Sequence, residues 1–122
     1  MAAMMGFRIL LVLILLVLTG YTAIVIANHG WNLLAVFFGD MAAIAWPGQF
    51  NLDFMGFLTL AALWTAWRHD FSAAGLLLGL VAFFGGMMFM TVYLLIASGT
   101  AKGDMKVVLL GARRAADQRA TA

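Results

Sequence analysis

Several residue types on which protein chemistry depends are missing from this sequence. It contains no cysteine and no glutamate, and it has a single proline. Without cysteine, the chain can form no disulfide, no thiolate metal site and no cysteine nucleophile. No glutamate can serve as a general base, and there is no Ser/His/Asp arrangement, no glycine-rich phosphate loop and no HExxH motif. We therefore do not expect an enzyme.

Charge is also scarce. Charged side chains make up 10% of the 122 residues, against about 25% in a typical soluble domain. The net charge is +2, and five of the seven Lys and Arg residues follow residue 100, namely Lys102, Lys106, Arg113, Arg114 and Arg119. This is a local basic tail rather than a basic surface interleaved with aromatic side chains, so nucleic acid is not expected as a partner.

Apolar residues, in contrast, make up 66% of the chain. A chain of this size cannot hide so much apolar surface in one soluble core, because a large share of its surface stays exposed after folding. Lipid is therefore the expected solvent. The length allows a single membrane domain, 1–122, and no second one. We expect a multi-pass protein of a bacterial inner (plasma) membrane.

Three apolar stretches are candidates to cross a bilayer core of about 30 Å, at about 7–27, 51–67 and 73–98. We interpret the first as an uncleaved signal anchor, because it is longer than the apolar region of a signal peptide. The predicted fold class is all-α integral membrane, with three transmembrane helices plus one interfacial or re-entrant helix at about 31–46. The tail, 99–122, is expected to rest on the membrane surface and to fray towards its end.

The stretch at 31–46 is the ambiguous one. It is apolar but short, and a crossing helix would put Asp40 near the bilayer centre at a cost of several kcal/mol. Trp31 and Trp46 bracket it, as in the aromatic belt at a membrane surface, and Pro47-Gly48 follows as a chain break. An interfacial or re-entrant helix is favoured, and a fourth span is the alternative.

The second and third spans are predicted to form an antiparallel hairpin. Asn51 is a plausible N-cap for the second span, and Asp53 would then lie in its first turn, where the helix dipole favours a carboxylate. His69-Asp70-Phe71 is expected to be a tight turn, and Ser72 the N-cap of the third span. That span would be about 39 Å long, so it should tilt.

Orientation follows from the distribution of Lys and Arg. Three spans place the termini on opposite sides, and the five cations of the tail then favour an outside N-terminus and a cytoplasmic C-terminal tail. Arg8 favours the reverse. Four spans would make both termini cytoplasmic and would leave only Arg68 on the wrong side.

Small residues follow one face of the third span, at Gly75, Gly79, Ala82 and Gly86. Such a face lets two helix backbones approach closely. It either packs within the chain or forms an interface with another copy or a partner. A second small face, with Gly56, Thr59 and Ala66 on the second span, is its possible mate.

Few side chains are candidates for chemistry. Asp40 and Asp53 are the carboxylates nearest the apolar zone, where ionisable residues are often functional. His29 could in principle ligate a haem or a pigment, as could His69, but both lie at predicted helix ends, where contact with headgroups is the simpler role. The methionines of the third span are interleaved with phenylalanine, which is typical of packing rather than of copper binding. No cofactor and no metal site are predicted.

The second half of the chain resembles small uncharacterised bacterial multi-span membrane proteins of the domain-of-unknown-function type. The resemblance runs from Trp46 to Gly111 and rests on WPGQFNLDFMGFLTLAALWTAWRHDFS, followed by YLLIASG and GDMKVVLLG. It implies an Asp that opens a helix, a Trp-and-Arg turn at the interface, a second helix and a basic tail. It implies no activity.

Three functions remain open from the sequence. The leading hypothesis is a small accessory or structural membrane subunit, associated with copies of itself or with a larger membrane complex. The first alternative is a homo-oligomeric small transporter or channel with Asp40 or Asp53 along its path. The weaker alternative is a pigment- or haem-associated subunit.

Overall fold

The computed structural model describes residues 2–121, which form six helices and no strand, with 87% of the chain helical. In chain order the helices are α1 (Ala2–His29), α2 (Leu33–Ala42), α3 (Trp46–Arg68), α4 (Ala73–Thr100), α5 (Met105–Leu110) and α6 (Ala112–Thr121). By length and composition, Ala3–His29 and Ala73–Thr100 are apolar enough to cross a membrane, and α2 with α3 adds a third candidate if the pair is one broken span. These helices suggest a membrane protein.

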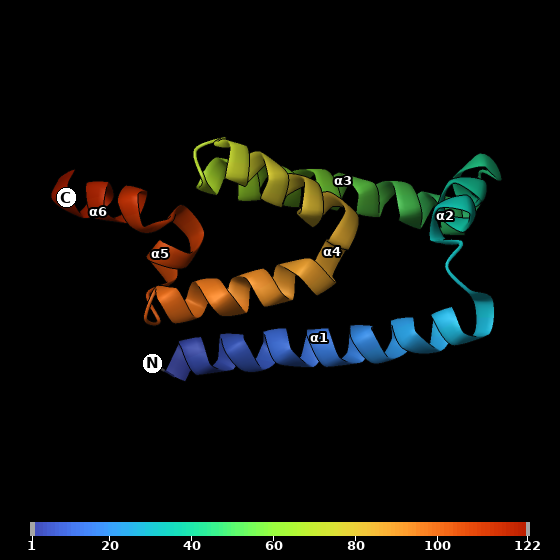
Figure 1. The fold of residues 1–122 in the computed structure, drawn as a ribbon, viewed down its shortest axis with the longest axis horizontal. Helices are drawn as coiled ribbons and strands as arrows, with labels where there is room; N and C mark the ends of the chain where they lie inside the picture. The colour runs from blue at the N-terminus through green and yellow to red at the C-terminus, as the bar shows by residue number, and fades with distance from the viewer. Residues whose placement is uncertain (1, 122) are drawn as a thin grey trace.

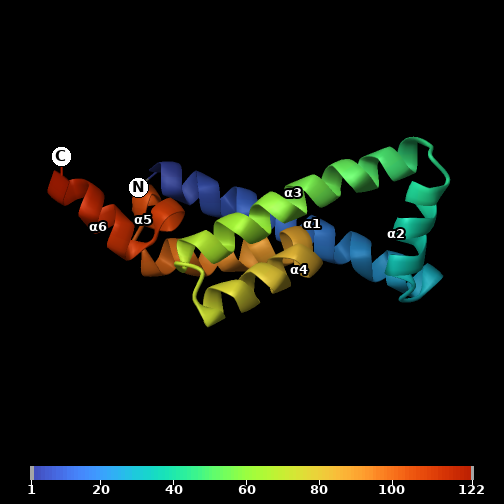
Figure 2. The ribbon, with the colours of Figure 1, turned by 90° about the horizontal axis from the view of Figure 1, so that it is seen from above.

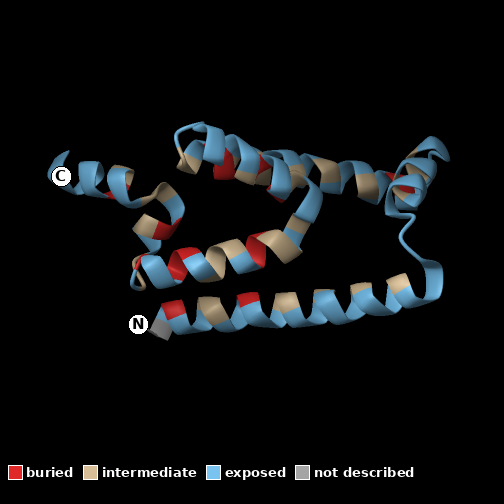
Figure 3. Ribbon diagram, in the orientation of Figure 1, coloured by how far each residue is buried: buried red, intermediate tan, exposed pale blue. Residues whose placement is uncertain are grey.

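The long helices run lengthwise, and α2 lies across one end of the molecule (Figures 1 and 2). α3 returns from α2 along the length of α1, and α4 packs against both. Most residues of these helices are exposed (Figure 3), and large apolar residues are exposed along all of them. Such a surface is suited to a lipid environment rather than to water.

α2 and α3 form a sharp corner of 114°. Gly48 is buried at this corner, and a β-carbon on it would collide with the backbone oxygen of Asp40. The side-chain amide of Asn51 donates to the backbone oxygen of Phe37 at 3.1 Å and so ties the two helices together. Only a glycine at Gly48 allows the backbones to come this close.

The helix boundaries at this corner differ from those expected. The α2 helix covers only Leu33–Ala42, and α3 begins at Trp46 rather than at Asn51. Pro47 does not break the chain, because proline is tolerated in the first turn of a helix, where its missing N–H would have no partner. Asn51 is therefore not an N-cap. Asp53 lies about 10 Å into the helix rather than in its first turn.

α4 is not one straight helix. Gly86 has φ 57° and ψ −140°, which interrupts the helical backbone. The first half of α4 runs along α3 to this break, and the second half turns back towards the end where α4 began (Figures 1 and 2). Ala73 and Thr100 would be about 40 Å apart in a straight helix. The expectation of one continuous helix about 39 Å long at 73–98 is therefore wrong.

The turn before α4 and its packing against α3 are close. As expected, Ser72 is the N-cap, with its side-chain oxygen accepting from the backbone N–H of Gly75 at 3.1 Å. A β-carbon on Gly79 would lie 2.9 Å from the backbone oxygen of Ala62, and one on Gly75 would lie 3.1 Å from that of Ala66. Small residues here let the two backbones touch.

The mate of this face was only partly anticipated. Ala66 is buried against α4, but a β-carbon on Gly56 would have nothing within 4 Å, and Thr59 is exposed. Ala62 makes the contact with α4 that was expected of Gly56 and Thr59. It lies one helical turn before Ala66 on the same face of α3.

The two termini lie at the same end of the molecule (Figure 1). Met4 packs with Ala97, Ala101 and Val108 in a small buried cluster. Arg8 donates to the side-chain oxygen of Ser98 at 3.0 Å and to its backbone oxygen at 2.9 Å. The expectation that the N-terminus and the tail lie at opposite ends is therefore wrong.

This end also holds every cation of the chain, and we call it the basic end. No Lys or Arg occurs between Arg8 and Arg68, and the other five follow the second half of α4. The tail that follows is helical in the described residues, with α5 at Met105–Leu110 and α6 at Ala112–Thr121. Asp104 caps α5 by accepting from the backbone N–H of Lys106 at 3.0 Å.

Candidate functional site

Arg68, the last residue of α3, joins three elements at the basic end. Its Nε donates to the backbone oxygen of Val108 at 2.7 Å, and its Nη2 to that of Val107 at 3.2 Å. Its Nη1 donates to the hydroxyl of Tyr93 in α4 at 2.9 Å. The last carbonyls of a helix lack their usual partners, so the guanidinium supplies a donor to Val108 and a second donor to Val107, which also accepts from the backbone N–H of Gly111. Arg68 therefore binds protein, in the Trp-and-Arg turn that the resemblance places at the membrane interface.

His69 follows directly and shares the same hydroxyl. Its Nε2 lies 2.6 Å from the Tyr93 hydroxyl, and the two rings meet edge to face. Burial is the main cause that lowers the pKa of His69 below 6.5, and the Arg68 guanidinium lowers it further, whereas Asp70 acts in the opposite direction. The imidazole is therefore neutral at pH 7, and the positive charge of this region comes from arginine.

Two arginines of α6 converge on Asp70 in the turn between α3 and α4. Arg113 and Arg114 each donate to the same carboxylate oxygen, Oδ1, at 2.6 Å. Arg114 also donates to the backbone oxygen of Trp67 at 2.6 Å and lies 3.9 Å above the indole ring. A cation over an aromatic face is attracted by the ring's quadrupole. The tail is thus held against the end of α3.

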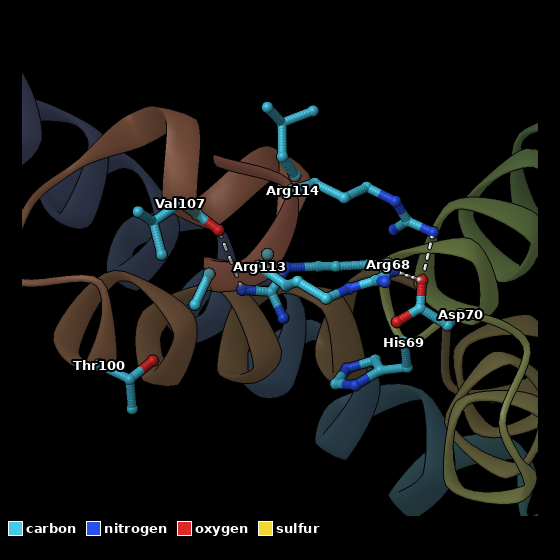
Figure 4. A pocket seen from close by; sticks show the side chains of 10 residues that line it. Arg68, His69, Asp70, Thr100, Val107, Arg113 and Arg114 are labelled. Atoms are coloured by element: carbon cyan, nitrogen blue, oxygen red, sulfur yellow. Dashed lines mark hydrogen bonds and ion pairs between the residues drawn. The ribbon is translucent and has the colours of Figure 1, made fainter. Parts of the chain in front are cut away.

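These groups surround a pocket of about 410 Å³ (Figure 4). Arg68, His69 and Asp70 form one side, and the tail forms the other with Val107, Arg113 and Arg114. Thr100, at the end of α4, also lines it, so both ends of α4 meet here. The lining contains three arginines and one carboxylate, and the site is suited to hold an anion rather than to carry out acid–base chemistry.

The predicted functional residues lie elsewhere. Asp40 is half-buried in α2, and Asp53 is exposed on α3. Among the hydrogen bonds of residues 2–121, none is accepted by the carboxylate of Asp40 or by that of Asp53. His29 is exposed in the last turn of α1. Within residues 2–121, no three His or Asp side chains gather as a metal site would require.

Gly75, Gly79 and Ala82 are buried within the chain, in contrast to these polar residues. Gly86 lies on the same side of α4, where a β-carbon would be 3.5 Å from the ring of Phe54 and 3.6 Å from Leu58. The structure therefore packs this small-residue face against α3 of the same molecule. Any second interface has to use another surface.

A second hollow, of about 590 Å³, lies at the corner of α2 and α3. Its lining is largely apolar, with Met41, Ile44, Trp46 and Leu52, and it contains no titratable side chain. Nothing in it can carry proton or metal chemistry.

The basic pocket was not predicted as a site from the sequence. Apart from Thr100, its residues come from two stretches about 40 positions apart, 68–70 and 107–114. The available signal was the lone Asp70 beside Arg68, since an isolated carboxylate is a natural partner for a basic tail. The sequence matches no family model, no curated protein and no solved structure.

Proposed function

We propose that this chain is a small accessory subunit of a membrane assembly, formed with copies of itself or with a larger membrane complex. In this proposal α1 and α3 cross the bilayer, α2 lies along one surface, and α4 enters from the basic end and returns to it. The α3 helix is about 35 Å long, enough to cross a core of about 30 Å, whereas each half of α4 is about 20 Å long.

The break at Gly86 carries the argument for an assembly. A helix break leaves carbonyls before it and amides after it without their usual partners. In a bilayer such groups are tolerated only where protein covers them or where they line a water-filled cavity. Phe84 and Gly85, directly before the break, are exposed. We infer that in the isolated chain backbone carbonyls at the break face lipid, and that an adjacent subunit would cover them.

The far half of α1 supports the same conclusion. α1 packs on α4 near its N-terminus, whereas its second half has almost no buried residue (Figure 3). Thr19 and Tyr21 are exposed there, and a β-carbon on Gly20 would have nothing within 4 Å. Small and polar residues of this kind are enriched where membrane helices pack together.

The basic end supports one orientation. Cytoplasmic segments carry an excess of Lys and Arg, and here all seven lie at the same end. With α4 re-entrant, both termini are cytoplasmic and no cation is on the wrong side. A reporter active only in the cytoplasm should be active at the C-terminus and inactive when inserted at Asn32. Activity at Asn32 would contradict this orientation.

Whether protein covers the break at Gly86 can be measured directly with a spin label on a single introduced cysteine, because the chain has no cysteine of its own. A nitroxide on Phe84→Cys is compared with one on Leu60→Cys, an exposed position on the unbroken α3. The protein is extracted with its surrounding lipid in polymer-bounded discs. We expect the label at 84 to collide rarely with oxygen, which dissolves in lipid, and rarely with a water-soluble nickel complex. The label at 60 should collide freely with oxygen.

The same measurement tests a second candidate, a homo-oligomeric pathway for an ion or solute. Broken helices also line such pathways in transporters, with backbone groups exposed at mid-membrane depth. Frequent collisions of the label at 84 with the nickel complex would favour that pathway, and the exposed Asp53 would then be tested by flux through Asp53→Asn in liposomes. Frequent collisions with oxygen alone would mean bare lipid at the break and would overturn both candidates.

A further inference from the structure

The pocket at the basic end has an excess of positive charge. Arg68, Arg113 and Arg114 line it together with a single carboxylate, Asp70, and with the neutral His69. Two of its three arginines are held by protein contacts, Arg68 on α5 and Arg114 on Trp67. Fixed cations lose less conformational entropy on binding than free ones, which favours binding of an anion.

These three arginines have more N–H donors than the hydrogen bonds of the described residues use. A guanidinium has five N–H groups. Within the described part of the chain, Arg68 donates three hydrogen bonds, Arg114 two and Arg113 one. The side chain of Arg113 is 67% exposed and that of Arg114 is 24% exposed, so donors remain within reach of a ligand. Forked guanidiniums match the oxygens of a phosphate group.

The position of the pocket indicates where such a phosphate would come from. Trp64 and Trp67 lie beside it on α3, and tryptophan is enriched at the level of lipid headgroups. The pocket also lies at the end assigned above to the cytoplasmic leaflet, which carries anionic lipids. Basic pockets between membrane helices on that side bind lipid headgroups of this class.

We infer that the pocket bounded by Arg68, Asp70, Arg113 and Arg114 binds the phosphate of an anionic phospholipid headgroup. Asp70 holds the two arginines of α6 side by side through one oxygen, and it competes with the ligand for them. The inference needs the membrane placement proposed above, but it does not need an assembly. Its test can therefore fail while the accessory-subunit proposal stands, and the reverse also holds.

The test uses the delipidated full chain in neutral detergent, titrated with phosphatidylglycerol or with phosphatidylcholine and followed by native mass spectrometry. We expect phosphatidylglycerol to be preferred. Arg113→Gln together with Arg114→Gln should weaken its binding about 25-fold, since each cation near a headgroup contributes about a factor of five. Arg119→Gln is the matched control, because it removes one cation from the same helix but outside the pocket, and it should change binding by less than about twofold.

The Asp70→Asn variant distinguishes a pocket that binds lipid from one whose ion pairs are only structural. Removing the competing carboxylate should tighten the binding of phosphatidylglycerol, whereas loss of a purely structural ion pair would loosen the tail and weaken it. Amide exchange in residues 105–121 shows whether the tail stays docked in each variant.

Competition with inorganic phosphate distinguishes a headgroup from a soluble anion. We expect millimolar phosphate to leave the bound phosphatidylglycerol in place, because the lipid also gains from its chains. Displacement of the lipid by phosphate at this millimolar concentration would assign the pocket to a soluble phosphate and overturn the lipid. Equal binding of the two lipids, or unchanged binding in the double variant, would overturn the site itself.

Discussion

Replacing Gly86 with alanine is expected to lower the free energy of unfolding by about 1–3 kcal/mol. Space is not the reason, because the added β-carbon would meet Phe54 and Leu58 at ordinary contact distances of 3.5 and 3.6 Å. The cost comes from the backbone, since φ 57° with ψ −140° is close to a region that only glycine adopts readily. Reversible unfolding in mixed detergent micelles measures the change.

Gly20→Ala is the matched control for this prediction. Gly20 has helical backbone in α1, and a β-carbon there would have open space around it. Alanine at this position should therefore be neutral or stabilise by up to about 1 kcal/mol. A Gly86→Ala protein as stable as Gly20→Ala would mean that α4 does not depend on the glycine break.

Alanine at position 86 would also permit a continuous α4, but we do not expect the chain to adopt it. A straight α4 would carry Thr100 about 40 Å from Ala73 and would take the tail to the other side of the bilayer. That change would break the contacts of Arg8 with Ser98 and of Arg68 with α5. It would also move five cations across the membrane. A C-terminal reporter should therefore stay on the same side in this variant.

Replacing Arg68 with glutamine is expected to release the tail, at a cost of about 2–4 kcal/mol. The change removes three hydrogen bonds from a charged donor and leaves the carbonyls of Val107 and Val108 without it. Amide exchange in residues 105–110 should then rise strongly, whereas exchange in α1 should change little. Arg68→Lys should recover little, because an ammonium group cannot span three separate acceptors as a guanidinium does.

Arg119→Gln provides the comparison for Arg68. Arg119 pairs with Asp104 at the surface, and both side chains are largely open to solvent. Exposed ion pairs contribute about 0–1 kcal/mol, so this variant should leave the exchange of residues 105–110 nearly unchanged. If Arg68→Gln behaved in the same way, the docking of α5 would have to depend on other contacts, such as the Trp64 indole N–H donating to the Leu109 oxygen.

Local signals in the sequence predicted part of this structure. Long apolar runs predicted the helices of α1, α3 and α4, and Ser72 was identified as an N-cap because its position before a helical run is typical of one. Proline misled the prediction at Pro47. Its meaning depends on whether it lies in the first turn of a helix or inside one, and the start of α3 at Trp46 could not be read from the sequence.

The break at Gly86 and the basic pocket could not be predicted for a different reason. Glycine is common in membrane helices, so Gly86 looks the same in sequence as Gly79, which is helical and only packs. The contacts of Arg68 are with Tyr93 and with residues about 40 positions away, and no periodicity reports such pairs. Both features depend on how α4 folds back, which only the tertiary structure determines.

The reversal of α4 has a consequence for how the protein enters the membrane during synthesis. In the proposed topology, the only segment that has to be translocated is the connection between α1 and α3, which is about 16 residues long and contains α2. It carries no Lys or Arg, and its single carboxylate is Asp40. The tail, with five cations, never leaves the side on which it was made. The chain can therefore be inserted as one helical hairpin, followed by a helix that only has to reach part of the way in.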